Sequence, residues 1–351
     1  MITVLDNKRM EHTKRAFITR NVPIEKMHLV ASNGLQPKSG DLVLAKVARL
    51  GNQSELELIS GRHAQLHEGD EIIVAYGNRY AADQYEATTP GNLGPCDLVS
   101  PSGIASKALN WSSKVTAPTQ IVPIGLLVNS QHQAINLSNF SINVAPPSKY
   151  PHVIAVVGSA MNSGKTTTAA NLIHGLKHHG HVVGAAKLTG TGTGDDLWKM
   201  KDAGASQVLD FTDVGYASTF KTPLPQLEHI AKQLLGELSN SGCTVIVVEI
   251  ADGIYQQETA ALIQSGALKQ IIDGYVYTAE SAASAVAGVQ WLQNYGEIFA
   301  ISGVVSASPL ASLETEAVTG LPCLTRQLLA LGSQQSQWLK PRMSELQYET
   351  A

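Results

Sequence analysis

The feature that most constrains the fold of this chain is a short apolar run that leads into a loop bounded by glycines. Residues Val153–Val157 are followed by Gly158-Ser-Ala-Met-Asn-Ser-Gly-Lys-Thr166. Loops of small residues between a buried strand and a helix direct backbone N–H groups at a phosphate. The helix predicted over Thr166–His178 would turn the positive end of its dipole toward the same anion. The pattern therefore predicts a phosphate-binding P-loop near the middle of the chain.

Each residue of this loop is a candidate to hold the phosphates of a nucleotide. Lys165 would reach the terminal phosphates, and the hydroxyl of Thr166 would bind Mg²⁺. The common pattern has its first glycine at the position of Ser159, whereas this chain has it one residue earlier. The nucleotide-binding candidates are Gly158, Ser159, Ala160, Met161, Asn162, Ser163, Gly164, Lys165, Thr166 and Thr167.

The lengthened loop resembles the P-loop of dethiobiotin synthetase and its relatives, in the SIMIBI branch of P-loop proteins. That branch includes cobyrinate amidases and molybdopterin-dinucleotide assembly proteins. The resemblance extends from Val153 to about Arg326, half of the chain. It implies ATP and Mg²⁺ as cofactors, and a homodimer.

A second strand is predicted over His181–Lys187, and the glycine-rich loop after it ends in Asp195 and Asp196. The resemblance implies that Lys187 lies near the reacting substrate and that Asp195 or Asp196 helps to hold Mg²⁺. Two alternatives stay open. Lys187 could be a solvated lysine at a strand end, and Asp196 could be the N-cap of a helix over Leu197–Ala203.

A third strand, Thr244–Val248, is followed by Glu249. An acidic residue at the carboxyl end of a central parallel strand is placed to hold Mg²⁺ or its water. The resembled family has a glycine-rich turn after this glutamate, whereas this chain reads Glu249-Ile-Ala-Asp-Gly253. We expect Glu249 to be a catalytic and metal-binding residue. The changed turn leaves the identity of the second substrate open, because this turn lies against that substrate in the resembled family.

Further strands and helices alternate to the end of this region. The loop after the last strand contacts the base in related nucleotide-binding proteins, and here it has no asparagine, so it does not distinguish adenine from guanine. The alternation predicts an α/β fold with a doubly wound, mostly parallel sheet. The predicted elements are the strands Gly274–Thr278, Ile298–Val305 and Leu321–Thr325 and the helices Ser281–Asn294 and Leu313–Thr319.

The first part of the chain has a different pattern, with short alternating segments separated by glycine, asparagine and aspartate turns. This spacing predicts a smaller, mainly-β domain built as an antiparallel barrel or sandwich. A helix is predicted over Pro101–Asn110. The expected domains are residues 1–146 for the β domain, 147–151 for a proline-rich linker, 152–330 for the P-loop domain and 331–351 for a polar tail. The predicted β segments are Asp41–Leu50, Ser54–Ile59, Glu71–Tyr76 and Ile121–Val128.

The composition limits the kinds of partner that we expect this protein to bind. A net charge of −4 in 351 residues argues against nucleic acid, and no apolar run has the ~20 residues of a membrane-spanning helix. Cys96, Cys243 and Cys323 match no metal or disulfide spacing, and the last two are expected to be buried hydrophobes. With no signal peptide at its start, the chain is expected to be cytoplasmic.

The leading hypothesis is an ATP- and Mg²⁺-dependent enzyme that activates a small carboxylate or similar acceptor by phosphoryl transfer. Lys165, Lys187 and Glu249 would be catalytic. One alternative is a nucleotide-dependent switch that acts on a protein partner. Another is an acyl transferase whose P-loop holds the phosphates of coenzyme A.

Overall fold

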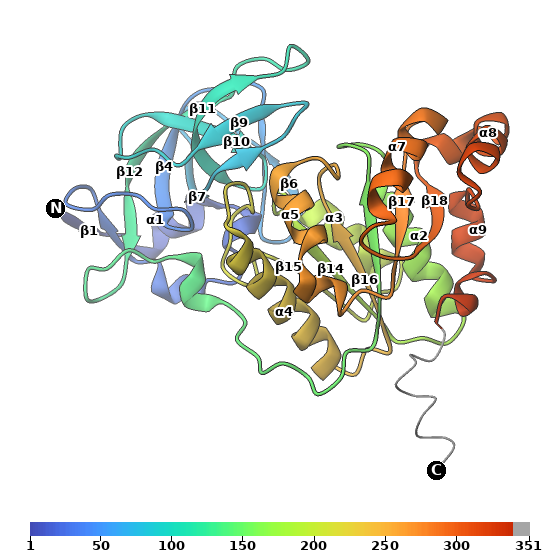
Figure 1. The fold of residues 1–351 in the computed structure, drawn as a ribbon. Helices are drawn as coiled ribbons and strands as arrows, with labels where there is room; N and C mark the ends of the chain where they lie inside the picture. Colours follow the sequence, from blue (N-terminus) through green and yellow to red (C-terminus); the bar gives the residue numbers. More distant parts are fainter. Residues whose placement is uncertain (340–351) are drawn as a thin grey trace. The chain divides into compact units, whose positions relative to one another are not determined.

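The computed structural model describes residues 1–339 (Figure 1). These residues form two compact units, each made from several segments. The barrel unit contains Met1–Ala145, Leu188–Trp198 and Leu209–Leu234. The P-loop unit contains Pro146–Lys187, Lys199–Val208 and the chain from Leu235 onward. The β domain expected from the sequence is therefore joined in its unit by two segments from the second half of the chain.

The barrel unit is built on a closed circuit of strands. Strand β10 pairs with both β11 and β12, so the path β12-β4-β7-β11-β10 returns to its start. All pairs in the circuit are antiparallel except β7 with β11, which is parallel. The predicted barrel is thus confirmed, with one parallel pair that was not expected. The five strands are β4 (Leu42–Arg49), β7 (Glu71–Tyr76), β10 (Cys96–Ser100), β11 (Ile104–Trp111) and β12 (Thr119–Val128).

Smaller elements surround this circuit. Strands β5 and β6 form a separate two-stranded sheet. The remaining strands are β1 (Ile2–Val4), β2 (Lys14–Arg15), β3 (Leu29–Ala31), β5 (Glu55–Glu57), β6 (His63–Gln65), β8 (Arg79–Tyr80) and β9 (Tyr85–Thr88). The helical elements are α1 (Asn7–His12), η1 (Phe17–Thr19), η2 (Ile24–Lys26) and η3 (Leu137–Phe140).

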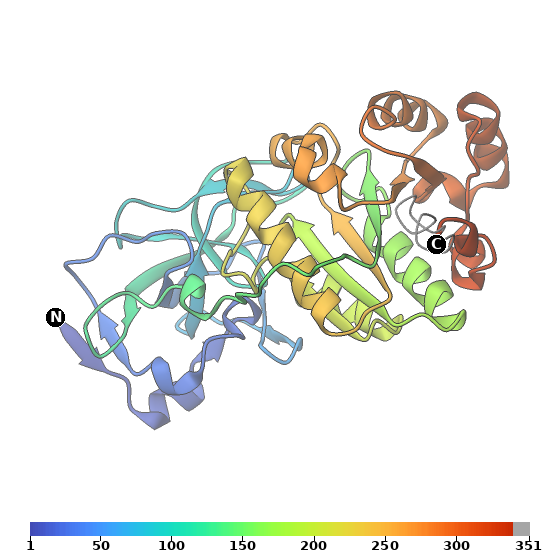
Figure 2. The same cartoon turned by 60° about the horizontal axis from the view of Figure 1, so that its bottom comes forward.

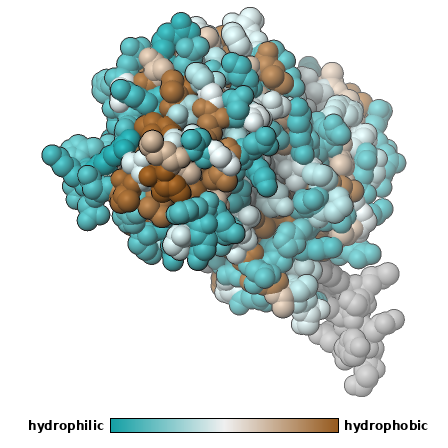
Figure 3. Space-filling view, turned by 90° about the vertical axis from the view of Figure 1, so that its left-hand side faces the viewer, coloured by the Kyte–Doolittle hydropathy of each residue, from teal (hydrophilic) through white to brown (hydrophobic). Residues whose placement is uncertain are grey.

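The central strands of the barrel are buried. Residues Leu42–Ala45 of β4 and Ile72–Tyr76 of β7 are all fully buried, so both faces of these strands are covered. Figure 3 shows that hydrophobic side chains also gather in one area of the outer face that it presents. Exposed apolar residues in the first segment include Met1, Val4 and Ile24.

The helix predicted over Pro101–Asn110 is wrong, because this segment contains most of strand β11. Alanine, lysine and leucine favour a helix here, but the backbone of β11 pairs with β7, β9 and β10. Ile104 and Ala105 are also buried in the barrel. Tertiary pairing and burial outweigh intrinsic helix propensity, which differs by less than about 1 kcal/mol per residue.

The second sheet has the strand order β15-β14-β16-β13-β17-β18. The pairs β16–β13, β13–β17 and β17–β18 are all parallel. This confirms the predicted α/β fold with a parallel, doubly wound sheet. The strands are β13 (His152–Gly158), β14 (Val183–Thr189), β15 (Gln207–Asp210), β16 (Val245–Ile250), β17 (Gly274–Thr278) and β18 (Ile298–Ser302).

Helices alternate with these strands along the chain. Within the P-loop unit, helix α9 packs beside α2, as Figure 2 shows. Leu172, Ile173 and Leu176 of α2 are buried in the core of this unit. The helical elements are α2 (Lys165–His178), α3 (Gly194–Asp202), α4 (Leu224–Asn240), α5 (Gln257–Gln264), α6 (Gly266–Lys269), α7 (Ala282–Leu292), η4 (Val304–Ala307), α8 (Pro309–Thr319), α9 (Arg326–Leu331) and η5 (Gln335–Gln337).

Three expectations near the C-terminus are corrected. Helix α8 begins at Pro309 rather than Leu313, because the Ser308 side chain accepts from Ala311 N and forms an N-cap. The expected strand Leu321–Thr325 is reduced to one bridge between Ile301 and Cys323. Part of the expected polar tail packs, since Trp338 stacks on Phe299 with ring centroids 5.1 Å apart. Residues 340–351 of that tail lie outside the described residues.

Candidate nucleotide-binding site

The P-loop connects strand β13 to helix α2, as the sequence predicted. Its first glycine is required by close contacts, because a Cβ atom at Gly158 would lie 2.3 Å from both Ser163 Oγ and Thr278 Oγ1. These two hydroxyl oxygens are themselves hydrogen-bonded at 2.7 Å. The early position of this glycine is thus explained by the way in which the loop folds back on β17.

The turn of the loop depends on two residues in the left-handed backbone region. Asn162 has a φ of 65° and Gly164 has a φ of 102°. The loop is also tied to the neighbouring strand ends, since Ser159 N donates to Thr278 O at 2.9 Å and Val304 N donates to Ser163 O at 3.1 Å. These bonds hold the loop in shape. A loop that is held in this way loses little conformational freedom when it binds an anion.

Lys165 is the first residue of α2 and is only 6% exposed. Its Nζ donates to Ala160 O at 2.7 Å, so the ammonium group lies over the P-loop backbone. Thr166 and Thr167 follow in the first helical turn, where helical N–H groups have no intrahelical acceptor. Lys165, the two threonines and the positive end of the helix dipole thus all lie at the start of α2, next to the P-loop.

Glu249 lies beside this loop and is 2% exposed. Strand β16 pairs in parallel with β13, with Glu249 in register with Val156. The turn after Glu249 rests on the P-loop, because Ile254 N donates to Gly158 O at 2.9 Å and a Cβ at Gly253 would lie 2.5 Å from Ser159 O. The expected proximity of the acidic residue and the phosphate loop is present.

Lys187 belongs to the same unit and is 8% exposed within strand β14. The alternative that it is a solvated lysine at a strand end is wrong, because the strand continues to Thr189 and the side chain is buried. A buried lysine is costly unless it meets an anion or another polar partner.

The structure assigns Asp195 and Asp196 to the barrel unit, whereas the P-loop, Lys187 and Glu249 belong to the other unit. Both aspartates lie in the first turn of α3, which starts at Gly194, so Asp196 is not the N-cap. Asp195 is exposed, and its Oδ1 lies 3.3 Å from His63 Nε2. Asp196 is half-buried.

A cavity of about 670 Å³ opens next to the P-loop within its unit. Its walls come from the start of α2, the end of β18, and helices α8 and α9, and they are mostly apolar. This volume is within the usual range for small-molecule sites. Its lining includes Gly164, Thr167, Gly303, Ser306 and Arg326.

The family resemblance indicated the loop after β18 as a contact for the base, and this loop lines the cavity. Nothing in the sequence indicated the far wall. Arg326 and Gln327 follow the segment Leu321–Thr325 that was expected to be a strand, and no local pattern marks them as a site. Cys323 also lines the cavity, and burial raises the pKa of its thiol. All three cysteines are free and buried, so the expectation of buried hydrophobes at Cys243 and Cys323 is confirmed.

With this geometry in place, comparison with known proteins gives one family match. Residues 153–261 match the family of molybdopterin guanine dinucleotide synthesis protein B. The match covers less than a third of the chain, so it describes the P-loop region rather than the whole protein. It lies within the expected SIMIBI branch of P-loop proteins and does not single out dethiobiotin synthetase. No curated protein matches the chain.

Solved structures show distant likeness only. The signal recognition particle 54 kDa protein from Aeropyrum pernix K1, in complex with GDP, is 23% identical over 57% of this chain and 49% of its own, with a TM-score of 0.38. This chain thus spans about half the length of that protein. A DUF1611 family protein from Anabaena variabilis is 13% identical over 56% of this chain and 61% of its own, with a TM-score of 0.39. These likenesses carry no argument about function.

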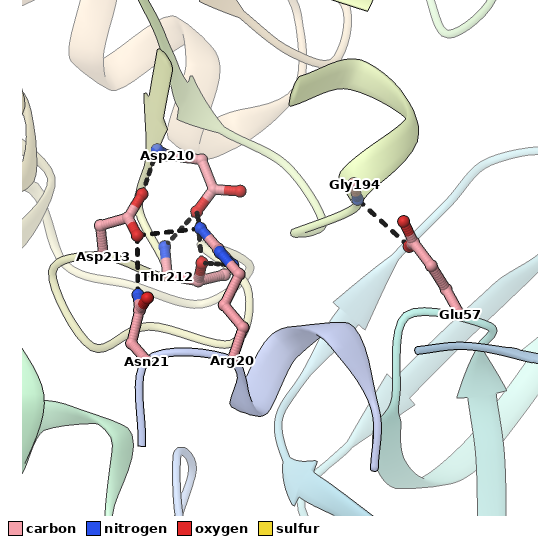
Figure 4. A network of polar contacts seen from close by, with 7 residues as sticks. All are labelled: Arg20, Asn21, Glu57, Gly194, Asp210, Thr212 and Asp213. Atoms are coloured by element: carbon pink, nitrogen blue, oxygen red, sulfur yellow. Dashed lines mark hydrogen bonds and ion pairs between the residues drawn. The ribbon is translucent and has the colours of Figure 1, made fainter. Parts of the chain in front are cut away.

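A buried polar network in the barrel unit was not anticipated (Figure 4). Arg20 lies just after η1, and its guanidinium donates to Thr212 Oγ1 at 2.6 Å and to Asp213 Oδ1 at 2.9 Å. Asp210 Oδ1 is 3.4 Å away, and Asn21 Nδ2 donates to Asp213 Oδ1 at 2.7 Å. Burial and the neighbouring Asp210 raise the pKa of Asp213, although Arg20 opposes the shift.

This network ties the loop after β15 to the N-terminal part of the chain. Arg20 and Asp210, for example, are 190 residues apart in the sequence. Sequence reasoning had no signal for it, because an isolated arginine and a distant aspartate pair form no motif.

No helix among residues 1–339 is both long enough and apolar enough to cross a membrane.

Proposed function

We propose that this protein is an ATP- and Mg²⁺-dependent enzyme that activates a small-molecule carboxylate or similar acceptor by phosphoryl transfer. The observation that carries the proposal is the packing of the turn after Glu249 on a preformed P-loop that already holds Lys165 over its backbone. The ammonium group of Lys165, the N-terminus of α2 and the carboxylate of Glu249 are the groups that bind a nucleoside triphosphate and its metal ion in P-loop sites.

Each residue has a distinct part in this proposal. Lys165 would bind the terminal phosphates and stabilise the charge that develops on the transferred group. Thr166 and Glu249 offer a hydroxyl and a carboxylate oxygen, which are the hard ligands that Mg²⁺ prefers. Lys187 would orient an anionic acceptor from its buried position in β14.

The cavity next to the loop supports a place for the rest of the nucleotide. It begins at Gly164 and Thr167 on the phosphate side and extends past Gly303 and Ser306 to Arg326. The base and ribose would lie on its mostly apolar wall, and Arg326 would contact a polar group at the far side. We further propose a homodimer in the cytoplasm, where three unpaired buried cysteines would stay reduced.

The same cavity favours one second candidate, an acyl transferase that holds coenzyme A. Among residues 1–339 its lining includes Arg326 but no carboxylate, so an additional phosphate beyond the P-loop would meet a cation there. Such a ligand needs no metal between its phosphates and Glu249. Dependence on Mg²⁺ therefore separates the two candidates.

Calorimetric titration of the full chain with ATP, GTP and coenzyme A, each with and without Mg²⁺, tests the proposal. We expect ATP to bind with an affinity that Mg²⁺ increases, and the Glu249→Gln variant to lose most of that increase. Tight binding of coenzyme A that is independent of Mg²⁺ would favour the acyl transferase. ATP hydrolysis that responds to a protein partner and to no small molecule would favour a switch.

A further inference from the structure

Three potential metal ligands meet in the barrel unit. Glu57, His63 and Asp195 each offer one ligand atom, and these atoms all lie within 4.8 Å of one another. No other group of three such residues is this close within residues 1–339. Acidic clusters are common on protein surfaces, so a metal site also requires side chains that the fold holds in place.

The β5–β6 hairpin places two of the ligands together. Glu57 and His63 are direct partners in its antiparallel register, so their side chains lie on the same face. The turn of the hairpin packs on α3, because a Cβ at Gly61 would lie 2.1 Å from Trp198 Nε1. This contact fixes the hairpin against the helix whose first turn carries Asp195.

Glu57 is fully buried and only half satisfied. Its Oε2 accepts from Gly194 N at 3.1 Å and from Thr193 Oγ1 at 3.3 Å, whereas its Oε1 is buried without a hydrogen-bond partner. Figure 4 shows the two oxygens at the end of the Glu57 side chain, one bonded to Gly194 and the other without a bond to any residue drawn. A buried carboxylate oxygen with no partner is costly, and a bound cation would remove the cost.

The guanidinium of Arg20 does not satisfy this oxygen. Arg20 is within electrostatic reach of Glu57, but it donates its hydrogen bonds to Thr212, Asp213 and Asp210 (Figure 4). The neutral alternative is a protonated Glu57, and burial does raise the pKa of this carboxyl. A protonated carboxyl would still need an acceptor for its hydrogen.

His63 is oriented as metal-binding histidines usually are. Its Nε2 lies 3.3 Å from Asp195 Oδ1, and its Nδ1 lies 3.5 Å from Glu55 Oε2. A carboxylate on the second ring nitrogen fixes the ring and raises its basicity as a ligand. Glu55 is two residues before Glu57 on the same strand, so its side chain shares that face of the hairpin.

We propose that Glu57, His63 and Asp195 bind one divalent transition-metal ion, with Zn²⁺ as the best fit. One imidazole nitrogen with two carboxylates suits Zn²⁺ or its first-row neighbours, whereas Mg²⁺ strongly prefers oxygen ligands alone. Three protein ligands leave a coordination position open to water or substrate, as in catalytic zinc sites. The exposed Asp195 gives solvent access to that position. The proposal does not depend on the nucleotide.

The test is calorimetric titration of the nucleotide-free, chelator-treated full chain with ZnCl₂. We expect one Zn²⁺ per chain, with Mg²⁺ in large excess unable to compete. Glu57→Gln, His63→Gln and Asp195→Asn should each weaken binding by at least ~10-fold, because loss of a ligand costs no less than loss of its supporting group. His67→Gln is the matched control, since His67 is exposed a few residues further along the same segment.

Two results would overturn the site. One is the absence of Zn²⁺ binding to the unaltered chain in the calorimeter and in competition with a zinc-sensitive dye. The other is binding that His63→Gln and Asp195→Asn leave unchanged, which would place the ion elsewhere. Because Glu57 is buried, circular dichroism must show that its variant is folded, and the two more accessible ligands decide the question if it is not.

Discussion

Lys165 is held over its binding loop before any ligand arrives, through the bond from Nζ to Ala160 O at 2.7 Å. A phosphate would compete for this ammonium group with a neutral carbonyl, and a charged acceptor makes the stronger hydrogen bond. We therefore expect this ammonium group to bind a phosphate in preference to the carbonyl of Ala160.

Replacement of this cation gives the most direct test of the loop. We expect Lys165→Ala to reduce nucleotide-dependent turnover by ~10²-fold or more, because it removes a charge from the developing transition state. Steady-state kinetics and calorimetric nucleotide titration measure the loss. Lys177→Ala, at the exposed end of the same helix, is the control and should behave like the unaltered protein. Unchanged turnover in Lys165→Ala would refute the P-loop assignment.

Glu249 is predicted to act on chemistry and on the part of nucleotide affinity that depends on Mg²⁺, rather than on binding by the loop itself. Glu249→Gln keeps the shape of a buried side chain but removes its charge. We expect nucleotide to bind still, through Lys165 and the loop backbone, while turnover falls by ~10²-fold. Normal turnover at saturating Mg²⁺ would show instead that Glu249 serves only to hold the turn that follows β16.

At the scale of elements, the strand-loop-helix that forms the P-loop tolerates little change in backbone packing. Gly158→Ala would place a methyl group 2.3 Å from Ser163 Oγ and Thr278 Oγ1. We expect a loss of about 1–3 kcal/mol in the free energy of unfolding, together with weaker nucleotide binding. Urea denaturation measures the first, with Gly91→Ala as the control, because nothing lies within 4 Å of that position. Equal midpoints for both variants would contradict the close packing.

The loop after β15 is a second element that depends on one residue. Arg20→Met would leave Asp210 and Asp213 as two buried carboxylates without their guanidinium partner. Loss of one member of a buried ion pair costs about 3–5 kcal/mol. Urea denaturation at pH 7.5 should show a loss of this order, and Arg62→Met, on an exposed arginine, should show none.

The pH dependence of this variant has a definite sign. The pKa of Asp213 is already raised, and removal of Arg20 would raise it further, because Arg20 is the group that lowers it. A raised carboxyl pKa means that the folded state takes up a proton more readily than the unfolded state. The deficit of Arg20→Met should thus be largest above the folded pKa and shrink as the pH falls through it. A deficit that grows on acidification would contradict this account.

Elements also show where local patterns mislead. The predicted helix over Pro101–Asn110 is strand β11, whereas the predicted strands Glu71–Tyr76 and Gly274–Thr278 match β7 and β17 residue for residue. The two correct strands are rich in β-branched or aromatic residues and are buried throughout or nearly so. Half of β11 is exposed and the strand is rich in helix formers, so only its partners decide its conformation.

At the scale of the whole molecule, each of the two units is built from segments that are separated in the sequence. Leu188–Trp198 and Leu209–Leu234 belong to the barrel unit, although the proline-rich segment near residue 147 reads as a boundary. A chain shortened to begin at Ser148 would lack Arg20 and the barrel core around Ala217. We therefore expect it to aggregate or to lose fixed tertiary structure.

Circular dichroism, size-exclusion chromatography and nucleotide titration of the shortened chain check this expectation. The full chain is the control. A soluble, cooperatively folding product that binds nucleotide with normal affinity would show that the P-loop unit is independent of the barrel after all.

The sequence by itself determined the features that depend on neighbouring residues. The P-loop, the start of α2 and the acidic Glu249 at the end of a buried strand could all be read from short segments, because a loop and its flanking strand and helix are contiguous. Parallel strands also bring their carboxyl ends to one edge, so the proximity of Glu249 to the loop followed from fold class.

Only the tertiary structure decided what distant segments share. The strand state of β11, the Arg20 network and the meeting of Glu57 and His63 with Asp195 each join residues from separate parts of the chain. None has a local pattern, since a buried charge or an exposed strand is stabilised by its partners rather than by its own propensity. Their positions follow from how the chain closes a barrel and places a hairpin against α3.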